Sequence, residues 1–268
     1  PGFLDAVHVT LIEASPALKM VQGQTLASAS VPINWAKDFD KAPSGPAVVI
    51  GNEFLDCLPI RQAIRHKGQW RERVVTLHPE DEARFVYGLG PVLGEADMAF
   101  IAPGLREADD GTLVELRPGD QQQIDQLAAW FDRDPGYALF VDYGSAKPET
   151  GDTLQAIRAH QKVDPLDAPG TADLTAWVDF DRLLRLGVDA GLSAFGPMTQ
   201  GDFLTELGIE QRAAVLSRSV DEAGQAKLKR QMHRLVSPED MGTLFKLAAF
   251  SSEGLPPAPG IAPFKRSR

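Results

Sequence analysis

The stretch Ala47-Val48-Val49-Ile50, followed directly by Gly51-Asn52-Glu53-Phe54-Leu55-Asp56-Cys57-Leu58-Pro59, decides the fold. A short apolar run that ends in a polar, acidic turn is typical of a buried strand in an open α/β sheet. In such sheets ligands bind outside the carboxyl ends of the strands, where loops present polar groups. Asn52, Glu53 and Asp56 fall at that point, so they are the candidate catalytic residues.

The sequence on either side of this strand alternates between strand and helix patterns. Upstream, residues 7–12 predict a strand, Ser15 and Pro16 predict the start of a helix that runs toward residue 28, and residues 33–36 predict a second strand. Downstream, apolar residues at three- and four-residue spacing predict a helix over 120–132, followed by a buried strand over 137–141. This order favours a mostly parallel sheet with crossover helices.

Two regions depart from the alternating pattern. Residues 60–87 read as strands separated by turns, which indicates an antiparallel insertion. Residues 151–181 are polar with little periodicity, so we expect a lid or a substrate wall without regular structure. Helices are predicted over 180–192, 200–207, 210–219 and 221–235, then a final strand over 243–250 and a loose tail from residue 256. The expected organisation is a core over 1–150 with the insertion at 60–90, a lid and helical region over 151–240, and a final strand and tail over 241–268.

Composition limits the classes of partner. The chain has 27 basic and 37 acidic residues, a net charge of -10, so nucleic acid is not expected as the main partner because phosphate binding needs clustered cations. A cationic partner suits this balance, although the charge could equally serve solubility alone. The single cysteine, Cys57, excludes an intrachain disulfide and points to a reducing compartment. Apolar neighbours favour a buried, inert Cys57 over a nucleophile, and no apolar run is long enough to span a membrane.

Glu13 directly follows the first predicted strand. A carboxylate at this position can accept hydrogen bonds from both hydroxyl groups of a ribose, as in enzymes that use nucleotide-like cofactors. An acid at the start of a helix can instead complement the helix dipole, so both interpretations stay open for Glu13.

The chain resembles, over nearly its whole length, the S-adenosylmethionine-dependent methyltransferase family named after MidA, which includes mitochondrial complex I assembly factors and bacterial homologues. The resemblance rests on six motifs: VTLIEASPAL at 9–18, GPAVVIGNEFLDCLPI at 45–60, VDYG at 141–144, GDTLQAIRAHQKVDPL at 151–166, GTADLTAWVDF at 170–180 and GPMTQGDFLTELGIEQRA at 196–213. It implies a class I methyltransferase fold, Rossmann-like, with a seven-stranded, mostly parallel sheet whose last strand is antiparallel. The family also has a first strand and a glycine-rich loop before the strand that ends in Glu13, and this sequence lacks both, so we expect it to be a partial chain that binds cofactor weakly.

The resemblance also implies roles for individual residues. Glu13 would hold the ribose of S-adenosylmethionine, Asp38 and Phe39 would lie near the adenine, and Asn52, Glu53 and Asp56 would lie beside the transferable methyl group. Asp38 could instead be a solvated residue before a turn, and Glu53 and Asp56 could only cap their loop. Five further positions match the substrate side of the family: Tyr143, His160, Asp173, Thr175 and Asp179. Family members often carry His where this chain has Trp177.

By resemblance, the expected activity is methylation of a protein arginine on a respiratory complex I subunit. Carboxylates are the natural partners of a planar, always charged guanidinium, so Glu53 and Asp56 suit this substrate. No metal is required, and His160 has no second ligand at metal-binding spacing. Two alternatives stay open: a non-catalytic assembly chaperone that grips a basic segment, and methylation of another substrate class. The expected location is the bacterial cytoplasm or, in a eukaryote, the mitochondrial matrix. The sequence leaves open whether the protein forms a homodimer.

Overall fold

The main sheet of the computed structural model, which describes residues 2–265, is built around one long strand, β8 (Gly136–Ser145). β3 (Ala47–Asn52) pairs in parallel with the first part of β8, and β12 (Val178–Asp179) pairs in parallel with its last two residues. The other edge of β8 carries β14 (Phe245–Ser251), which is antiparallel and in turn pairs with β13 (Ser193–Thr199). The expected mixed α/β fold with an antiparallel last strand is therefore confirmed.

A second, smaller sheet contains only β1 (Val9–Ile12) and β2 (Ile33–Ala36), in parallel register. The helix α2 (Pro16–Thr25) connects them and begins as predicted, with Pro16 in its first turn and the Ser15 hydroxyl accepting the Leu18 N–H. In the described residues β1 pairs only with β2, and no strand pairs with the far edge of β3. The expectation of a further strand beside β1 stays a prediction.

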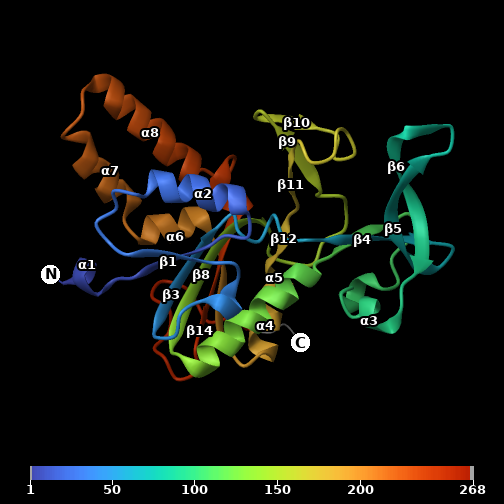
Figure 1. Ribbon diagram of the computed structural model, residues 1–268, viewed down its shortest axis with the longest axis horizontal. Helices are drawn as coiled ribbons and strands as arrows, with labels where there is room; N and C mark the ends of the chain where they lie inside the picture. The colour runs from blue at the N-terminus through green and yellow to red at the C-terminus, as the bar shows by residue number, and fades with distance from the viewer. Residues whose placement is uncertain (1, 266–268) are drawn as a thin grey trace.

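Helices α4 (Pro118–Arg133) and α5 (Phe180–Asp189) cover one face of the main sheet (Figure 1). Apolar residues at helical spacing on α4 and α5 pack on β8 and β14, which explains why both helices form: they bury Ile124, Leu127, Leu183, Leu184, Phe140 and Phe250 in one core. The helices α6 (Gln200–Glu206), α7 (Ile209–Ser217), α8 (Glu222–Val236) and α9 (Met241–Leu244) follow β13 and lie toward the opposite end of the molecule from the insertion (Figure 1). No helix in residues 2–265 is both long enough and apolar enough to cross a bilayer.

The predicted antiparallel insertion is confirmed as a four-stranded sheet in the order β6-β5-β4-β7, which stands apart from the main sheet (Figure 1). Its strands are β4 (Arg61–His66), β5 (Gln69–His78), β6 (Asp81–Val92) and β7 (Leu113–Leu116). The turn between β5 and β6 is short, because β5 ends at His78 and β6 already begins at Asp81. Between β6 and β7 lie the short helix α3 (Glu95–Met98) and a 3-10 turn, which cover a separate core around Trp70 and Ile101.

Three further predictions are wrong, two of them in the second half of the chain. Residues 151–181 are not a structureless lid, because β9 (Gln155–Arg158), β10 (Gln161–Val163) and β11 (Asp173–Thr175) form a small antiparallel sheet. Its hairpin turns at Ala159 and His160, both with positive φ, and this pair lacks the Asn-Gly signature that would have revealed the turn. The tail is not loose up to residue 264, because Ile261 is buried and the Phe264 N–H donates to the Ala194 carbonyl. Cys57 is exposed rather than buried.

Candidate active site

The candidate active site lies where β3 ends and β12 takes its place beside β8. Both strands use the same edge of β8, so the loop that leaves β3 meets the segment that leads into β12. The Ala176 N–H donates to the Asp56 carbonyl at 3.0 Å and joins the two directly. This topology brings Asp56 next to Tyr143 and to the segment that contains Thr175.

Glu53 is the exposed acid of the loop. Its φ of 49° lies in the left-handed region, which is uncommon for a residue other than glycine and is found preferentially at functional sites. The Glu53 N–H still donates to the Val141 carbonyl at 2.9 Å, and the Asn52 side chain donates to the Glu53 carboxylate at 3.2 Å. The side chain of Glu53 is therefore directed by its neighbour while remaining open to solvent.

Asp56 is the buried acid of the loop, with an exposed fraction of 5%. The Tyr143 hydroxyl donates to its carboxylate, and burial together with this hydrogen bond raises the pKa of Tyr143. Tyr143 therefore stays protonated and holds Asp56 in one orientation. Glu53 and Asp56 thus present one solvated and one fixed carboxylate, an arrangement suited to holding a cation with several N–H groups.

Asp142 supports the loop from below and was not among the predicted site residues. It is fully buried, and one carboxylate oxygen accepts the Leu55 N–H at 2.9 Å and the Asp56 N–H at 3.1 Å. Burial, reinforced by the charge of Asp56, raises the pKa of Asp142 to about 7. The only signal in the sequence was the position of Asp142 at a strand end.

The substrate-side residues predicted from the resemblance divide into two groups. Thr175 and Asp179 flank the Ala176 contact, and Asp179 caps α5 by accepting the Arg182 N–H at 2.9 Å. Burial raises the pKa of Asp179. His160 is exposed in the β9–β10 turn and Asp173 is exposed at the start of β11, and neither has a hydrogen bond to the 52–58 loop in the part of the chain described. Their assignment to the substrate side stays a prediction.

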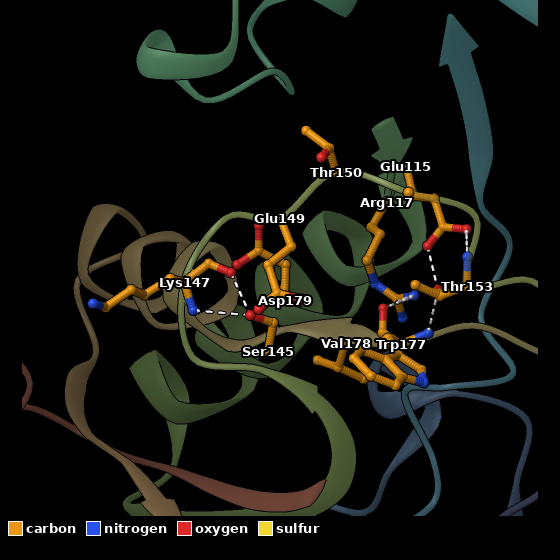
Figure 2. A pocket seen from close by; sticks show the side chains of 11 residues that line it. Glu115, Arg117, Ser145, Lys147, Glu149, Thr150, Thr153, Trp177, Val178 and Asp179 are labelled. Carbon is orange, nitrogen blue, oxygen red and sulfur yellow. Dashed lines mark hydrogen bonds between the residues drawn. The ribbon is translucent and has the colours of Figure 1, made fainter. Parts of the chain in front are cut away.

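A small cavity of about 50 Å³ lies at the end of β8, beside Trp177 and Asp179 (Figure 2). Its wall includes Glu115, whose carboxylate accepts from the Thr153 N–H at 2.9 Å and the Gln62 side chain at 3.0 Å.

Cys57 is an exposed residue, but partial desolvation of its thiol raises the pKa of that group. An inert thiol is therefore still the better interpretation. No cluster of His, Cys, Asp and Glu suited to a metal ion occurs in residues 2–265.

A larger cavity, about 970 Å³, separates the β1–β2 sheet from β3. Ile12, Gln22, Phe39 and Val49 are among the residues that line it, and it lies beside the edges of β1 and β3 that have no partner strand in residues 2–265. Phe39 is 2% exposed and packs against Phe54 and Trp130, so it forms a wall of this cavity rather than a free stacking platform.

Two carboxylates, Glu13 and Asp38, are adjacent in sequence to residues that line this cavity, whose wall also includes the amides of Gln22 and Asn34. Glu13 receives the Ser15 N–H at 2.7 Å and the Gln22 side chain at 2.9 Å, which leaves acceptor capacity on both oxygens. Asp38 has a buried oxygen, Oδ1, and its side-chain contact with Asp40 raises the pKa of Asp38. The free acceptor capacity of Glu13 therefore fits a ligand that carries hydroxyl donors.

Comparison with known proteins places these features in a family. Residues 1–198 match the family described as putative S-adenosyl-L-methionine-dependent methyltransferase. The chain is 34% identical over 264 residues to the mitochondrial protein arginine methyltransferase NDUFAF7 of Xenopus laevis, covering 90% of this chain and 58% of that protein. It is 31% identical to the protein of the same name from Homo sapiens, covering 91% and 58%. The chain thus spans less than two thirds of the length of these relatives.

Two solved structures from Burkholderia thailandensis are also similar. An uncharacterised protein has a TM-score of 0.76 and 27% identity, covering 91% of this chain and 66% of that one. A likely methyl transferase bound to S-adenosyl-homocysteine has a TM-score of 0.73 and 26% identity, covering 91% and 64%. Both likenesses cover most of this chain rather than one motif.

Proposed function

The chain belongs to the family of putative S-adenosyl-L-methionine-dependent methyltransferases, and we propose that it methylates a guanidinium nitrogen of an arginine in a protein. The observation that carries this proposal is the pair of carboxylates after β3, Glu53 exposed and Asp56 held by Tyr143. The relatives from Xenopus laevis and Homo sapiens are named protein arginine methyltransferases, which supports the choice of arginine.

For the cofactor, we propose that Glu13 accepts from the ribose hydroxyls and that Asp38 and Phe39 lie near the adenine. S-adenosylmethionine supplies an electrophilic methyl group on its sulfonium when bound. The similar structure bound to S-adenosyl-homocysteine supports this cofactor. Asn52, at the end of β3, would face the methionine end.

For the transfer step, Glu53 and Asp56 accept N–H groups of the guanidinium and align one of its nitrogens with the methyl carbon. When bound, S-adenosylmethionine would supply the methyl group and leave as S-adenosyl-homocysteine, and Glu53 or Asp56 would take the proton that the guanidinium nitrogen loses. Alignment and near contact contribute more to such a step than a strong base does. The Tyr143 hydroxyl keeps the Asp56 carboxylate in the required orientation.

The substrate proposed is a basic segment of a respiratory complex subunit. The net charge of -10 favours a cationic partner, and the named relatives are mitochondrial proteins. We therefore propose the mitochondrial matrix as the location if the source is eukaryotic, and the cytoplasm if it is bacterial.

Methyl transfer to an arginine peptide tests the proposal. The chain, and a form extended at its N-terminus, are incubated with labelled S-adenosylmethionine and a basic peptide that carries either arginine or lysine. We expect label on the arginine peptide only, and about 100-fold less with Asp56→Asn or Glu53→Gln. Glu80→Gln, in an exposed turn of the insertion, is the matched control and keeps the wild-type rate.

Unchanged rates in Asp56→Asn and Glu53→Gln would contradict the role of the carboxylates. Tight binding of the arginine peptide without transfer by either form would contradict the methyltransferase proposal and support the assembly chaperone.

A further inference from the structure

Arg117 is a fully buried cation that lies beside Trp177 (Figure 2). One terminal nitrogen donates to the Leu55 carbonyl at 2.6 Å, and the other donates to the Trp177 carbonyl at 3.0 Å and the Ala176 carbonyl at 3.5 Å. The guanidinium therefore bridges the loop after β3 and the segment before β12. A single side chain can join two backbone segments in this way because its donors form a rigid, planar fork.

The charge of Arg117 is balanced by Asp120, in the first turn of α4. Asp120 is fully buried and accepts from the guanidinium at 2.7 and 3.1 Å. Burial alone would lower the pKa of Arg117, but the Asp120 carboxylate raises it above its ordinary value, so the ion pair persists. A buried ion pair rarely adds net stability compared with apolar packing. The role of this pair is therefore better sought in the backbone segments that Arg117 joins.

The start of α4 also packs directly on the end of the loop. A Cβ on Gly119 would come within 2.9 Å of the Leu58 Cβ and 3.3 Å of the Pro59 carbonyl, so only glycine allows this approach. On the other side of the loop, Asp142 accepts the Leu55 N–H. Leu55 is thus bonded through its carbonyl to the Arg117 guanidinium and through its N–H to the Asp142 carboxyl.

We propose that Arg117 is a positioning residue, which fixes Asp56 in the loop after β3 relative to the substrate-side segment Ala176–Asp179. The contacts stand on the structure alone, whereas their meaning for methyl transfer rests on the proposed function. Loss of the fork would let the two segments separate while leaving the strands beneath them in place.

Amide hydrogen exchange tests the positioning role without any need for activity. Because Arg117→Met would leave Asp120 buried and unpaired, the test variant is Arg117→Met with Asp120→Leu. We expect exchange at Leu55, Asp56 and Ala176 to become about 10- to 100-fold faster, the effect of losing a hydrogen bond to a charged group, while Leu127 and Ala248 stay unchanged. The control Arg185→Met with Asp181→Leu removes the Arg–Asp pair of α5 and should leave the three loop amides unchanged. Unchanged exchange at these amides, or equal acceleration at Leu127 and Ala248, would overturn the inference.

Kinetics separate positioning from a merely structural role. In the test variant kcat for methyl transfer should fall about 100-fold, because small misplacements of aligned groups are this costly, while the Kd for S-adenosylmethionine stays within about twofold. Arg117→Lys keeps the positive charge but not the planar fork of donors, so its kcat should lie between those of the wild type and the test variant. Wild-type kcat in the test variant would overturn the inference. Absence of arginine methylation by the wild-type protein would instead contradict the proposed function, and the exchange result would still decide the inference.

Discussion

Glu13 and Asp56 follow two parallel strands, but the two carboxylates are held by different kinds of contact. Glu13 is held by residues two and nine positions away, Ser15 and Gln22. The Asp56 loop is held by Asp142, Arg117 and Tyr143, and the residues joined by these hydrogen bonds are 62 or more positions apart along the chain. The cofactor side is therefore built locally, whereas the transfer side depends on the assembled core.

This difference has consequences for stability. A locally built feature can lose a partner without disturbing the rest of the fold. A loop held by buried charges leaves several polar groups without partners when one charge is removed. The comparison predicts that equivalent changes cost more on the transfer side than on the cofactor side.

The largest effect is expected for Asp142→Ala. The Leu55, Asp56 and Tyr143 N–H groups all donate to Asp142 and would become buried and unpaired. We expect the free energy of unfolding to fall by about 3 kcal/mol or more. Urea denaturation measures it, with Glu13→Ala as the control, for which a loss below about 1 kcal/mol is expected. An equal fall in the free energy of unfolding for Asp142→Ala and Glu13→Ala would contradict the difference between the transfer side and the cofactor side.

Gly144→Ala is expected to have the next largest effect. Its Cβ would lie 2.0 Å from the Val178 carbonyl oxygen, so β12 must move away from β8. A clash with backbone in a packed region costs about 1–3 kcal/mol. A shift in the urea midpoint checks this prediction, and a midpoint equal to that of the wild type would show that β12 does not approach β8 so closely.

The pH dependence of the free energy of unfolding tests the Asp142 carboxyl, which supports the transfer side. Because the pKa of Asp142 is about 7 in the folded protein and near 3.8 when unfolded, the folded state binds the extra proton between these values. The contribution of this carboxyl is fully present below about pH 4 and is lost as the pH rises through 7, with a slope of at most about 1.4 kcal/mol per pH unit. Asp142→Asn should reduce that slope in urea titrations between pH 4 and 8. An identical slope in both proteins would contradict the buried, protonated carboxyl.

The smallest expected effect is an increase in stability from a substitution on the cofactor side. Gly23 lies in the helix α2, and nothing stands within 4 Å of a Cβ placed there. Gly23→Ala should therefore stabilise the protein by about 0.5–1 kcal/mol, because alanine loses less conformational freedom in a helix. Thermal unfolding should show a higher Tm, and a lower one would mean that α2 is packed more tightly than the structure shows.

The same division explains how much could be predicted from the sequence. Glu13, Ser15 and Pro16 form a local pattern, and the helix start and strand end that it predicted are present. Arg117 and Asp120 gave no local signal, because their role appears only when residues 55 and 176–177 meet in the folded core. Asp142 was visible only as an acid at a strand end. The strands β9–β11 were missed because each is only three or four residues long and their hairpin lacks the usual turn residues.

Calorimetric binding of S-adenosylmethionine most directly tests the central claim that this is a methyltransferase whose cofactor is held at the end of β1. It is measured on this chain and on a form extended at its N-terminus, each with and without Glu13→Ala. We predict binding by the extended form and a Kd that Glu13→Ala raises about 10-fold or more, since two hydrogen bonds to a carboxylate are lost. Absence of binding by both forms, or a Kd unchanged by Glu13→Ala, would contradict the account.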